Sequence, residues 1–191
     1  YMFSDNITDQ MKKNASYAME YFLNNIGGSF ELVLNASYNL MWEKSIFSLV
    51  DYNEDPTEQY LLHKGIKQII DRVKNQNDVL ENIYLYYQND DIAFKTDSII
   101  NDSAWISGEF GMDSDTFNEY IIDHNGEFTV LNKNEGEEKI VYIKSIDKKL
   151  AVGNVFAIFV LNSDIIKNSI GTKKYDENAQ TFLIDDYDNY L

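Results

Sequence analysis

The sequence predicts an α+β fold in which a long N-terminal helix packs on a five-stranded antiparallel sheet. Residues 1–50 contain no proline and repeat apolar residues with helical spacing, whereas the pattern alternates with a period of two from Val79 onward. Short polar connections between the later strands favour antiparallel neighbours. A longer segment, 97–123, follows the second strand and is expected to form a loop-and-helix insertion in the sheet.

The predicted first helix covers residues 1–50. Its apolar or small side chains recur mostly at steps of three, four or seven, which is the spacing of one helix face. They are Ile7, Met11, Ala15, Ala18, Phe22, Ile26, Val33, Ala36 and Leu40. A helix of this length exceeds an ordinary globular helix and is typical of a stalk. Gly27 and Gly28 are its weak point, where we expect a bend.

A second helix is predicted after a short break. Asp55 is its expected N-cap, Pro56 occupies the first turn, and Glu58 is placed to reach back as in a capping box. Its apolar face consists of Leu61, Leu62, Ile66, Ile69, Ile70 and Val73. The polar residues 74–78 end it.

The remaining elements follow from alternation and from turn residues. Aromatic and β-branched residues predict a hairpin of strands 82–87 and 92–96. An irregular stretch, 97–112, leads to Asp113, which caps a short helix with Phe117, Tyr120 and Ile121 inward. Further strands are predicted at 127–131, 139–146, 152–161 and 181–184, with a short helix at 164–170.

Composition restricts the classes of function. The net charge is −16, and Arg72 is the one arginine, so no basic face is present to neutralise the phosphates of a nucleic acid. The chain has no cysteine, which excludes disulfides and thiol catalysis. No run of eighteen apolar residues occurs, so we expect any membrane anchor to lie in flanking segments.

Enzymatic and metal-dependent functions find little support in the sequence. His63 and His124 are the only histidines, and no G-x-S-x-G stretch accompanies them. The acidic stretches 113–115 and 185–189 lack the glycine and distal glutamate of an EF-hand loop, so capping and turn roles are favoured. We therefore expect no enzyme, no cofactor and no metal site.

Aromatic residues provide the better indication of a binding site. Tyr84 and Tyr86 share one face of the first strand, so they are expected to meet either the helices or the insertion with Trp105. Aromatic rings with a few polar groups beneath a loop are typical of a small-molecule pocket. The candidate ligand-binding residues are Tyr84, Tyr86, Trp105, Phe110, Tyr120, Tyr142, Lys144 and Asn154. A plain aromatic core is the alternative interpretation.

Charge near the insertion favours an uncharged or cationic ligand. Trp105 offers a flat surface that can stack on a sugar or attract a cation. The surrounding carboxylates disfavour an anion, and no arginine in the insertion offsets them. They are Asp97, Asp102, Glu109, Asp113 and Asp115.

The order of elements, the hairpin 82–93 and the later strand 153–162 together resemble the PAS-like extracellular Cache sensor domains of bacterial membrane receptors. Such receptors include histidine kinases, chemoreceptors and membrane-bound AraC-type transcriptional regulators of Gram-positive bacteria. The resemblance implies a helical stalk at 1–78, a Cache module at 79–170, and a linker with a following strand at 171–191. The last segment looks like the first hairpin of a second module in tandem versions.

The resemblance implies an extracytoplasmic ligand-sensing domain of a membrane-tethered signalling receptor. Its output, a kinase or an AraC-type regulator, stays open, and a surface or secreted adhesion domain is the alternative. Amino-acid receptors of this kind pair a tyrosine, an arginine, a tryptophan and an aspartate, but the insertion and strands here contain no arginine. Tyr17, Tyr38 and Trp42 form an expected exposed stripe through which a second copy could pair.

Overall fold

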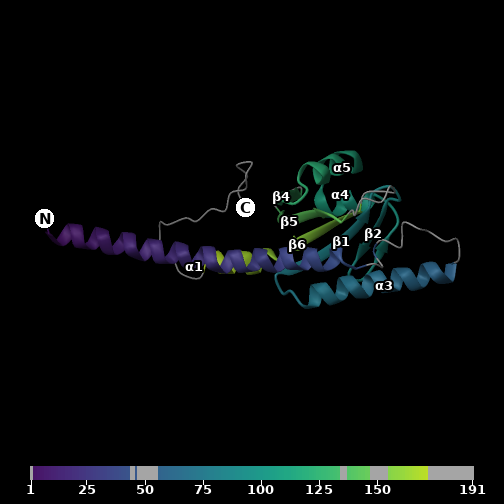
Figure 1. Cartoon of the computed structure of the whole chain (residues 1–191). Coiled ribbons are helices and arrows are strands. Elements are labelled where there is room, and N and C mark those ends of the chain that lie inside the picture. The colour runs from purple at the N-terminus through teal and green to yellow at the C-terminus, as the bar shows by residue number, and fades with distance from the viewer. Residues whose placement is uncertain (1, 44–45, 47–55, 134–136, 147–154, 172–191) are drawn as a thin grey trace.

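The computed structural model describes residues 2–43, 46, 56–133, 137–146 and 155–171 (Figure 1). The helices are α1 (Met2–Met41), α3 (Pro56–Asn75), α4 (Ala104–Phe110), α5 (Ser114–Asp123) and α6 (Ser163–Gly171). The strands are β1 (Leu80–Tyr87), β2 (Ile92–Lys95), β3 (Ile99–Ile100), β4 (Phe128–Lys133), β5 (Glu137–Ser145) and β6 (Val155–Leu161). No helix in these ranges is long and apolar enough to span a membrane.

One antiparallel sheet of six strands organises the described residues, in the order β3-β2-β1-β6-β5-β4. The α+β class and the antiparallel pairing are therefore confirmed. The sixth strand, β3, lies in the stretch predicted to be irregular. Ile99 pairs with Phe94 and Ile100 with Ala93, so two β-branched residues extend the edge beside β2.

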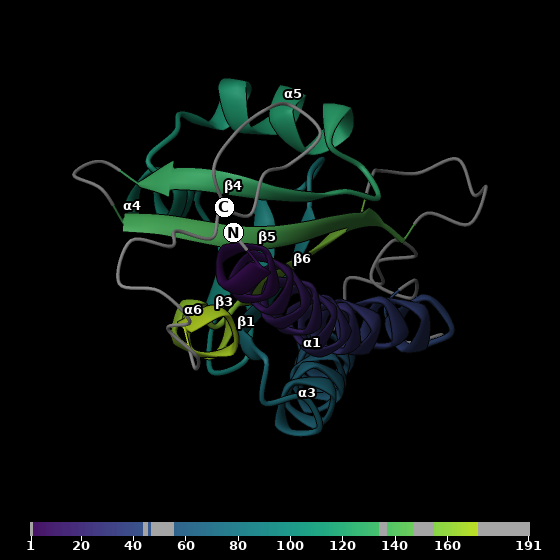
Figure 2. The same ribbon diagram turned by 90° about the vertical axis from the view of Figure 1, so that its left-hand side faces the viewer.

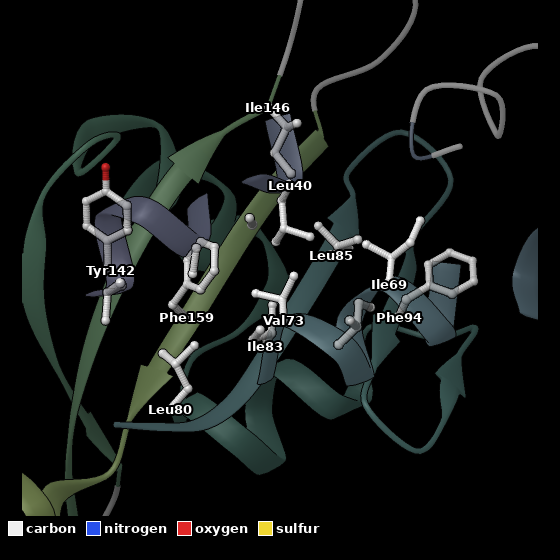
Figure 3. Packing of buried hydrophobic residues seen from close by; sticks show 14 of the residues in the cluster. Leu40, Ile69, Val73, Leu80, Ile83, Leu85, Phe94, Tyr142, Ile146 and Phe159 are labelled. Carbon is white, nitrogen blue, oxygen red and sulfur yellow. The ribbon is translucent and has the colours of Figure 1, made fainter. Parts of the chain in front are cut away.

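Helices cover both faces of this sheet. Figure 2 shows α5 above the sheet and α1, α3 and α6 beneath it. On the lower face, Ile83 and Leu85 of β1 pack with Leu40 of α1 and Val73 of α3 in one hydrophobic core (Figure 3). Tyr87 of β1 belongs to the same core. The sequence predicts that the side chains of β1 alternate between two faces and leaves open which face meets the helices; in the structure Ile83, Leu85 and Tyr87 face the long helices.

The first helix is continuous but shorter than predicted. α1 passes through Gly27 and Gly28 without a break and ends at Met41 instead of near Val50. The amides of Trp42 and Glu43 then bond to carbonyls three residues back, as in a tight 3₁₀ turn. Tertiary contacts outweigh helix propensity here. An ion pair joins Glu43 to Arg72 of α3, and Ile46 is fully buried, with its carbonyl accepting the hydroxyl of Tyr87 at 2.8 Å.

The insertion contains one helix more than the sequence predicts. α4 lies inside the stretch predicted to be irregular, and its Ile106 and Phe110 are fully buried, one turn apart on one face. It ends at Gly111, whose φ of 70° is the left-handed conformation that glycine adopts without strain. The helix capped by Asp113 is confirmed, because the Asp113 carboxylate accepts the amide of Thr116 at 2.9 Å.

The other predicted elements agree with the structure where it describes them. α3 begins at Pro56, α6 covers the predicted short helix, and β6 ends at the predicted residue, Leu161. The proposed N-cap Asp55, the residues 152–154 and the predicted strand 181–184 lie outside the described residues.

Candidate functional site

An aromatic cluster lies between the sheet and the insertion. It consists of Tyr84 and Tyr86 on β1, Trp105 and Phe110 on α4, and Phe117 on α5. Trp105 stacks on Tyr84, with ring centroids 5.0 Å apart, and Phe110 stacks on Phe117 at 5.1 Å. Trp105 also contacts the rings of Tyr86 and Phe117 edge-on, at 5.8 and 6.0 Å. The insertion is therefore attached to β1 mainly through aromatic rings.

Local sequence signals place the two insertion helices over the sheet. The carboxylate of Asp102 accepts the amide of Ala104 at 2.8 Å, where α4 begins. Gly111 closes α4, and Asp113 caps α5 two residues later. The turn between the two short helices changes the direction of the chain. As a result, both helices lie over the sheet and place aromatic side chains against β1.

Polar atoms without partners lie within and beside the aromatic cluster. The hydroxyl of Tyr84, the indole nitrogen of Trp105 and the amide oxygen of Asn118 are buried and have no hydrogen-bond partner among the described residues. An unsatisfied buried donor or acceptor costs about 1 to 3 kcal/mol. Two donors and one acceptor in this region thus have no partner. A polar ligand could supply the missing hydrogen bonds.

Charged side chains surround the cluster. Glu109 of α4 forms an ion pair with Lys139 of β5, whose side chain is only 10% exposed. The ammonium of Lys95 lies 5.7 Å from the ring centroid of Tyr84. On the other side, the hydroxyl of Tyr86 donates to the carboxylate of Asp91 at 3.1 Å. The site thus combines both signs of charge instead of presenting a purely acidic surface.

The phenols of the cluster are held in their protonated form. Burial raises the pKa of Tyr84 well above its ordinary value, and the Glu109 carboxylate, which lies beside the Tyr84 hydroxyl without a hydrogen bond of normal length and angle, raises it further. Burial and the adjacent Asp91 raise the pKa of Tyr86 to about 12. For Glu109, burial raises the pKa, but the ion pair with Lys139 outweighs it and leaves the pKa below the ordinary value. At neutral pH the two tyrosines are therefore hydrogen-bond donors beside a carboxylate.

The structure brings together only part of the predicted site. Tyr84, Tyr86, Trp105 and Phe110 belong to the aromatic cluster. Tyr120 packs at its margin, where its hydroxyl lies 2.6 Å from the hydroxyl of Thr129.

The other predicted residues are placed elsewhere. Tyr142 faces α1 on the opposite side of the sheet, and Lys144, two residues further along β5, shares that face. Both residues therefore lie on the face of the sheet opposite to the one that Trp105 covers. Asn154 lies outside the described residues.

Two residues of the site carry weaker sequence signals. Phe117 is expected to point inward from its helix, but no pattern indicates that it meets Trp105. Asn118 follows it and leaves a buried amide oxygen unpaired. The sequence signal for Asn118 is its position directly after Phe117, an inward-facing aromatic residue on a short helix.

The remaining candidate chemical groups lie apart from the cluster. His63 contacts Phe94 edge-on at 5.2 Å, on the face covered by the long helices. His124 stacks on Tyr120, with ring centroids 3.9 Å apart, at the end of α5. Arg72 pairs with Glu43 next to α1. Within the described ranges, no three histidines or carboxylates are grouped to hold a metal ion.

Comparisons with known proteins identify the fold. No protein-family model matches the chain, and no curated protein matches it in sequence. Among solved structures, it is similar to the ligand-binding domain of the Campylobacter jejuni chemoreceptor Tlp3 in complex with L-norvaline. The TM-score is 0.59 at 12% identity, over 96% of this chain and 68% of that one.

Two further structures of that domain, with isoleucine and with L-valine bound, both give TM-scores of 0.53 at 12% identity. They match over 98% of this chain, and over 71% and 72% of theirs. The likeness shows that this chain has the fold of these Cache-type sensory domains, as the sequence resemblance indicates.

Proposed function

We propose that this Cache-type fold serves as the ligand-sensing domain of a bacterial transmembrane receptor, with the ligand held between β1 and the α4–α5 insertion. The observation that carries the proposal is the set of unpartnered buried polar atoms beside the aromatic cluster, on Tyr84, Trp105 and Asn118. A core selected only for stability would pair these atoms or replace them with apolar groups. A ligand that bonds to them would recover that cost on binding.

The arrangement of these atoms favours a small ligand with a polar end. Trp105 and Tyr84 supply N–H and O–H donors, whereas Asn118 and Asp91 supply acceptors. A ligand with an acceptor at one end and an amine at the other matches both sides. Its net charge would be zero or positive, because the chain carries −16 overall and has no arginine in the insertion.

Amino acids with uncharged side chains belong to this class, since their ammonium and carboxylate charges cancel at neutral pH. The structural neighbours in complex with norvaline, isoleucine and valine support a small-molecule ligand for this chain. Without an arginine, a ligand carboxylate would rely on Trp105, Tyr84 and Lys95. Such a site would hold a carboxylate less tightly than a bidentate guanidinium does. An amine, an alcohol or a sugar would not depend on that contact.

The same fold also supports a proposal for where the domain lies in a receptor. The domain would lie on the outer side of the cell membrane, tethered through segments that flank it, with α1 as the stalk. A chemoreceptor, a histidine kinase or a membrane-bound AraC-type regulator would each use such a domain in the same way. Ligand binding would shift the population of insertion conformations, and the shift would reach α1.

The experiment that tests this proposal is a thermal-shift screen of amino acids, amines and sugars. L-isoleucine, L-valine and L-norvaline are included, and each hit is measured by calorimetry. Trp105→Phe keeps an aromatic ring but removes the indole N–H, so it should weaken binding of the hit about two- to tenfold, as the loss of one hydrogen bond does. Trp42→Phe is the matched control, because Trp42 is the other tryptophan and is 74% exposed.

The Trp42→Phe variant also provides a direct signal, because Trp105 is then the sole tryptophan. Binding at the proposed site should change its fluorescence. Equal affinity of Trp105→Phe and the unmodified chain, or a screen in which no compound raises the melting temperature, would contradict the proposal.

A further inference from the structure

We propose that β4 couples the aromatic cluster to α1, through two neighbouring side chains on its opposite faces. This inference deepens the proposed sensor function and rests on it for its biological meaning. The two side chains are Thr129, which faces the insertion, and Phe128, which faces α1. Figure 2 shows β4 and β5 lying between α5 and α1.

On the insertion side, β4 is bonded to α5. The hydroxyl of Tyr120 lies 2.6 Å from that of Thr129 and donates to the carbonyl of Val130 at 3.3 Å. Thr129 is fully buried and Tyr120 is half-buried, so bulk water reaches this contact from one side only. Tyr120 follows Phe117 by one helical turn, and the Phe117 ring lies 6.0 Å from that of Trp105. A displacement of Trp105 by a ligand would therefore reach β4 through α5.

On the α1 side, the first residue of β4 forms an aromatic stack with α1. The ring of Phe128 lies parallel to that of Phe30 on α1, with centroids 4.3 Å apart and an interplanar angle of 21°. Phe128 also contacts Tyr142 of β5 at 4.7 Å, and Tyr142 contacts Phe159 of β6 at 6.0 Å. Phe30 is thus the point where α1 meets a row of rings that crosses three strands.

The position of β4 makes it suited to small movements. It is the last strand of the described sheet, so β5 is the only strand to which its backbone pairs there. An edge strand can tilt without breaking the ladder of the central strands β1 and β6. A second contact between the insertion and the sheet is the ion pair of Glu109 with Lys139, which joins α4 to the neighbouring strand β5. The insertion therefore holds the β4–β5 pair at two points, and α1 contacts the same pair from below.

The test uses amide hydrogen exchange of the whole chain and needs no ligand. Tyr120→Phe removes the hydroxyl that contacts Thr129 and the carbonyl of Val130, without removing the ring. It should raise exchange of α1 amides around Phe30 by about two- to tenfold, the factor expected if even one of these two bonds contributes. Exchange of the α3 amides should stay unchanged. This result would distinguish coupling between β4 and α1 from destabilisation of the whole domain. Tyr60→Phe is the matched control, because Tyr60 lies on α3 and is 65% exposed.

A double-mutant cycle completes the test. In a Phe30→Ala background, the effect of Tyr120→Phe on α1 exchange should disappear, because the stack that carries it is gone. Thr129→Val provides the same test from the other side of the bond, if Tyr120→Phe does not fold.

An unchanged α1 exchange in both single variants, or an effect that persists fully without Phe30, would overturn the coupling role of β4. Neither result would bear on whether the chain binds a ligand, because no ligand takes part.

Discussion

The indole ring of Trp105 lies nearly parallel to the phenol ring of Tyr84, 5.0 Å between centroids and 17° between planes, and each ring carries a buried polar atom without a partner among the described side chains. Stacking stabilises the pair, whereas the two unpaired atoms destabilise it. Favourable packing together with unpaired buried polar atoms is expected at a site that binds a ligand, because such a site is not selected for stability alone.

Two tyrosines on opposite faces of β1, Tyr84 and Tyr87, should respond differently to loss of their hydroxyl groups. Tyr84→Phe should leave the free energy of unfolding unchanged or slightly higher, because its hydroxyl is unpaired. Tyr87→Phe should lower it by about 1 to 2 kcal/mol, because the buried carbonyl of Ile46 loses its donor. Urea denaturation of both variants measures the difference. Equal effects would mean that the Tyr84 hydroxyl is paired in solution.

The ion pair of Glu109 and Lys139 should stabilise the insertion. Lys139→Met leaves a partly buried carboxylate without its partner, so we expect a loss of about 1 to 3 kcal/mol. Adding Glu109→Gln removes the unpaired charge and should restore part of that loss. Chemical denaturation of the single and double variants gives the coupling energy, and strictly additive effects would argue against the pair.

Alkaline pH should destabilise the chain through the buried tyrosines. The pKa of Tyr86 is about 12 in the folded state, above the ordinary value of about 10, so the folded state holds this proton more tightly. Its contribution is complete below about pH 10 and is lost as the pH rises toward 12. Tyr84 and Tyr87 shift in the same direction because both are buried.

Denaturation midpoints at pH 9, 10.5 and 11.5 should therefore fall steeply, and Tyr86→Phe should reduce the slope. A flat profile across this range would show that these phenols ionise as easily in the folded chain as in the unfolded one.

The exposed aromatic residues of α1 predict contact with a second copy. Tyr17 and Tyr38 are 67% and 57% exposed and lie three heptads apart on the helix, the spacing of a helix-pairing seam. Since the chain has no cysteine, Tyr38→Cys introduces a single thiol that should crosslink two copies of a membrane-anchored receptor. Tyr60→Cys on α3 is the exposed control. Equal crosslinking of the two variants, together with a strictly monomeric domain in sedimentation, would exclude this interface.

Several features of the fold could be predicted because they are local. The change of period near Val79 marks the passage from helix to strand, and alternation along β1 separates Tyr84 from Leu85. The cap of α5 depends on Asp113 and Thr116, three residues apart. The end of α1 could not be predicted from local sequence, because the residues that follow it contact Arg72 and Tyr87, which are twenty-nine and forty-one residues away.

The site was harder to predict for a related reason. Alternation shows which residues of one strand share a face, but it does not show how the faces of different strands correspond. Tyr142 is opposite Phe128 and faces α1, and this register depends on the pairing of β4 with β5. Helix α4 has only seven residues, too few for a clear helical period.

The length of α1 has a mechanical consequence. Its face from Ile26 to Leu40 is buried against the domain, whereas its N-terminal half projects past the sheet (Figure 1). At about 1.5 Å per residue, the projecting part is a lever arm of roughly 36 Å. A tilt of about 5° at the packed end would swing the far end by about 3 Å, if the helix stays rigid. A small movement of Phe30 would thus displace the N-terminal end of α1 by about one hydrogen-bond length.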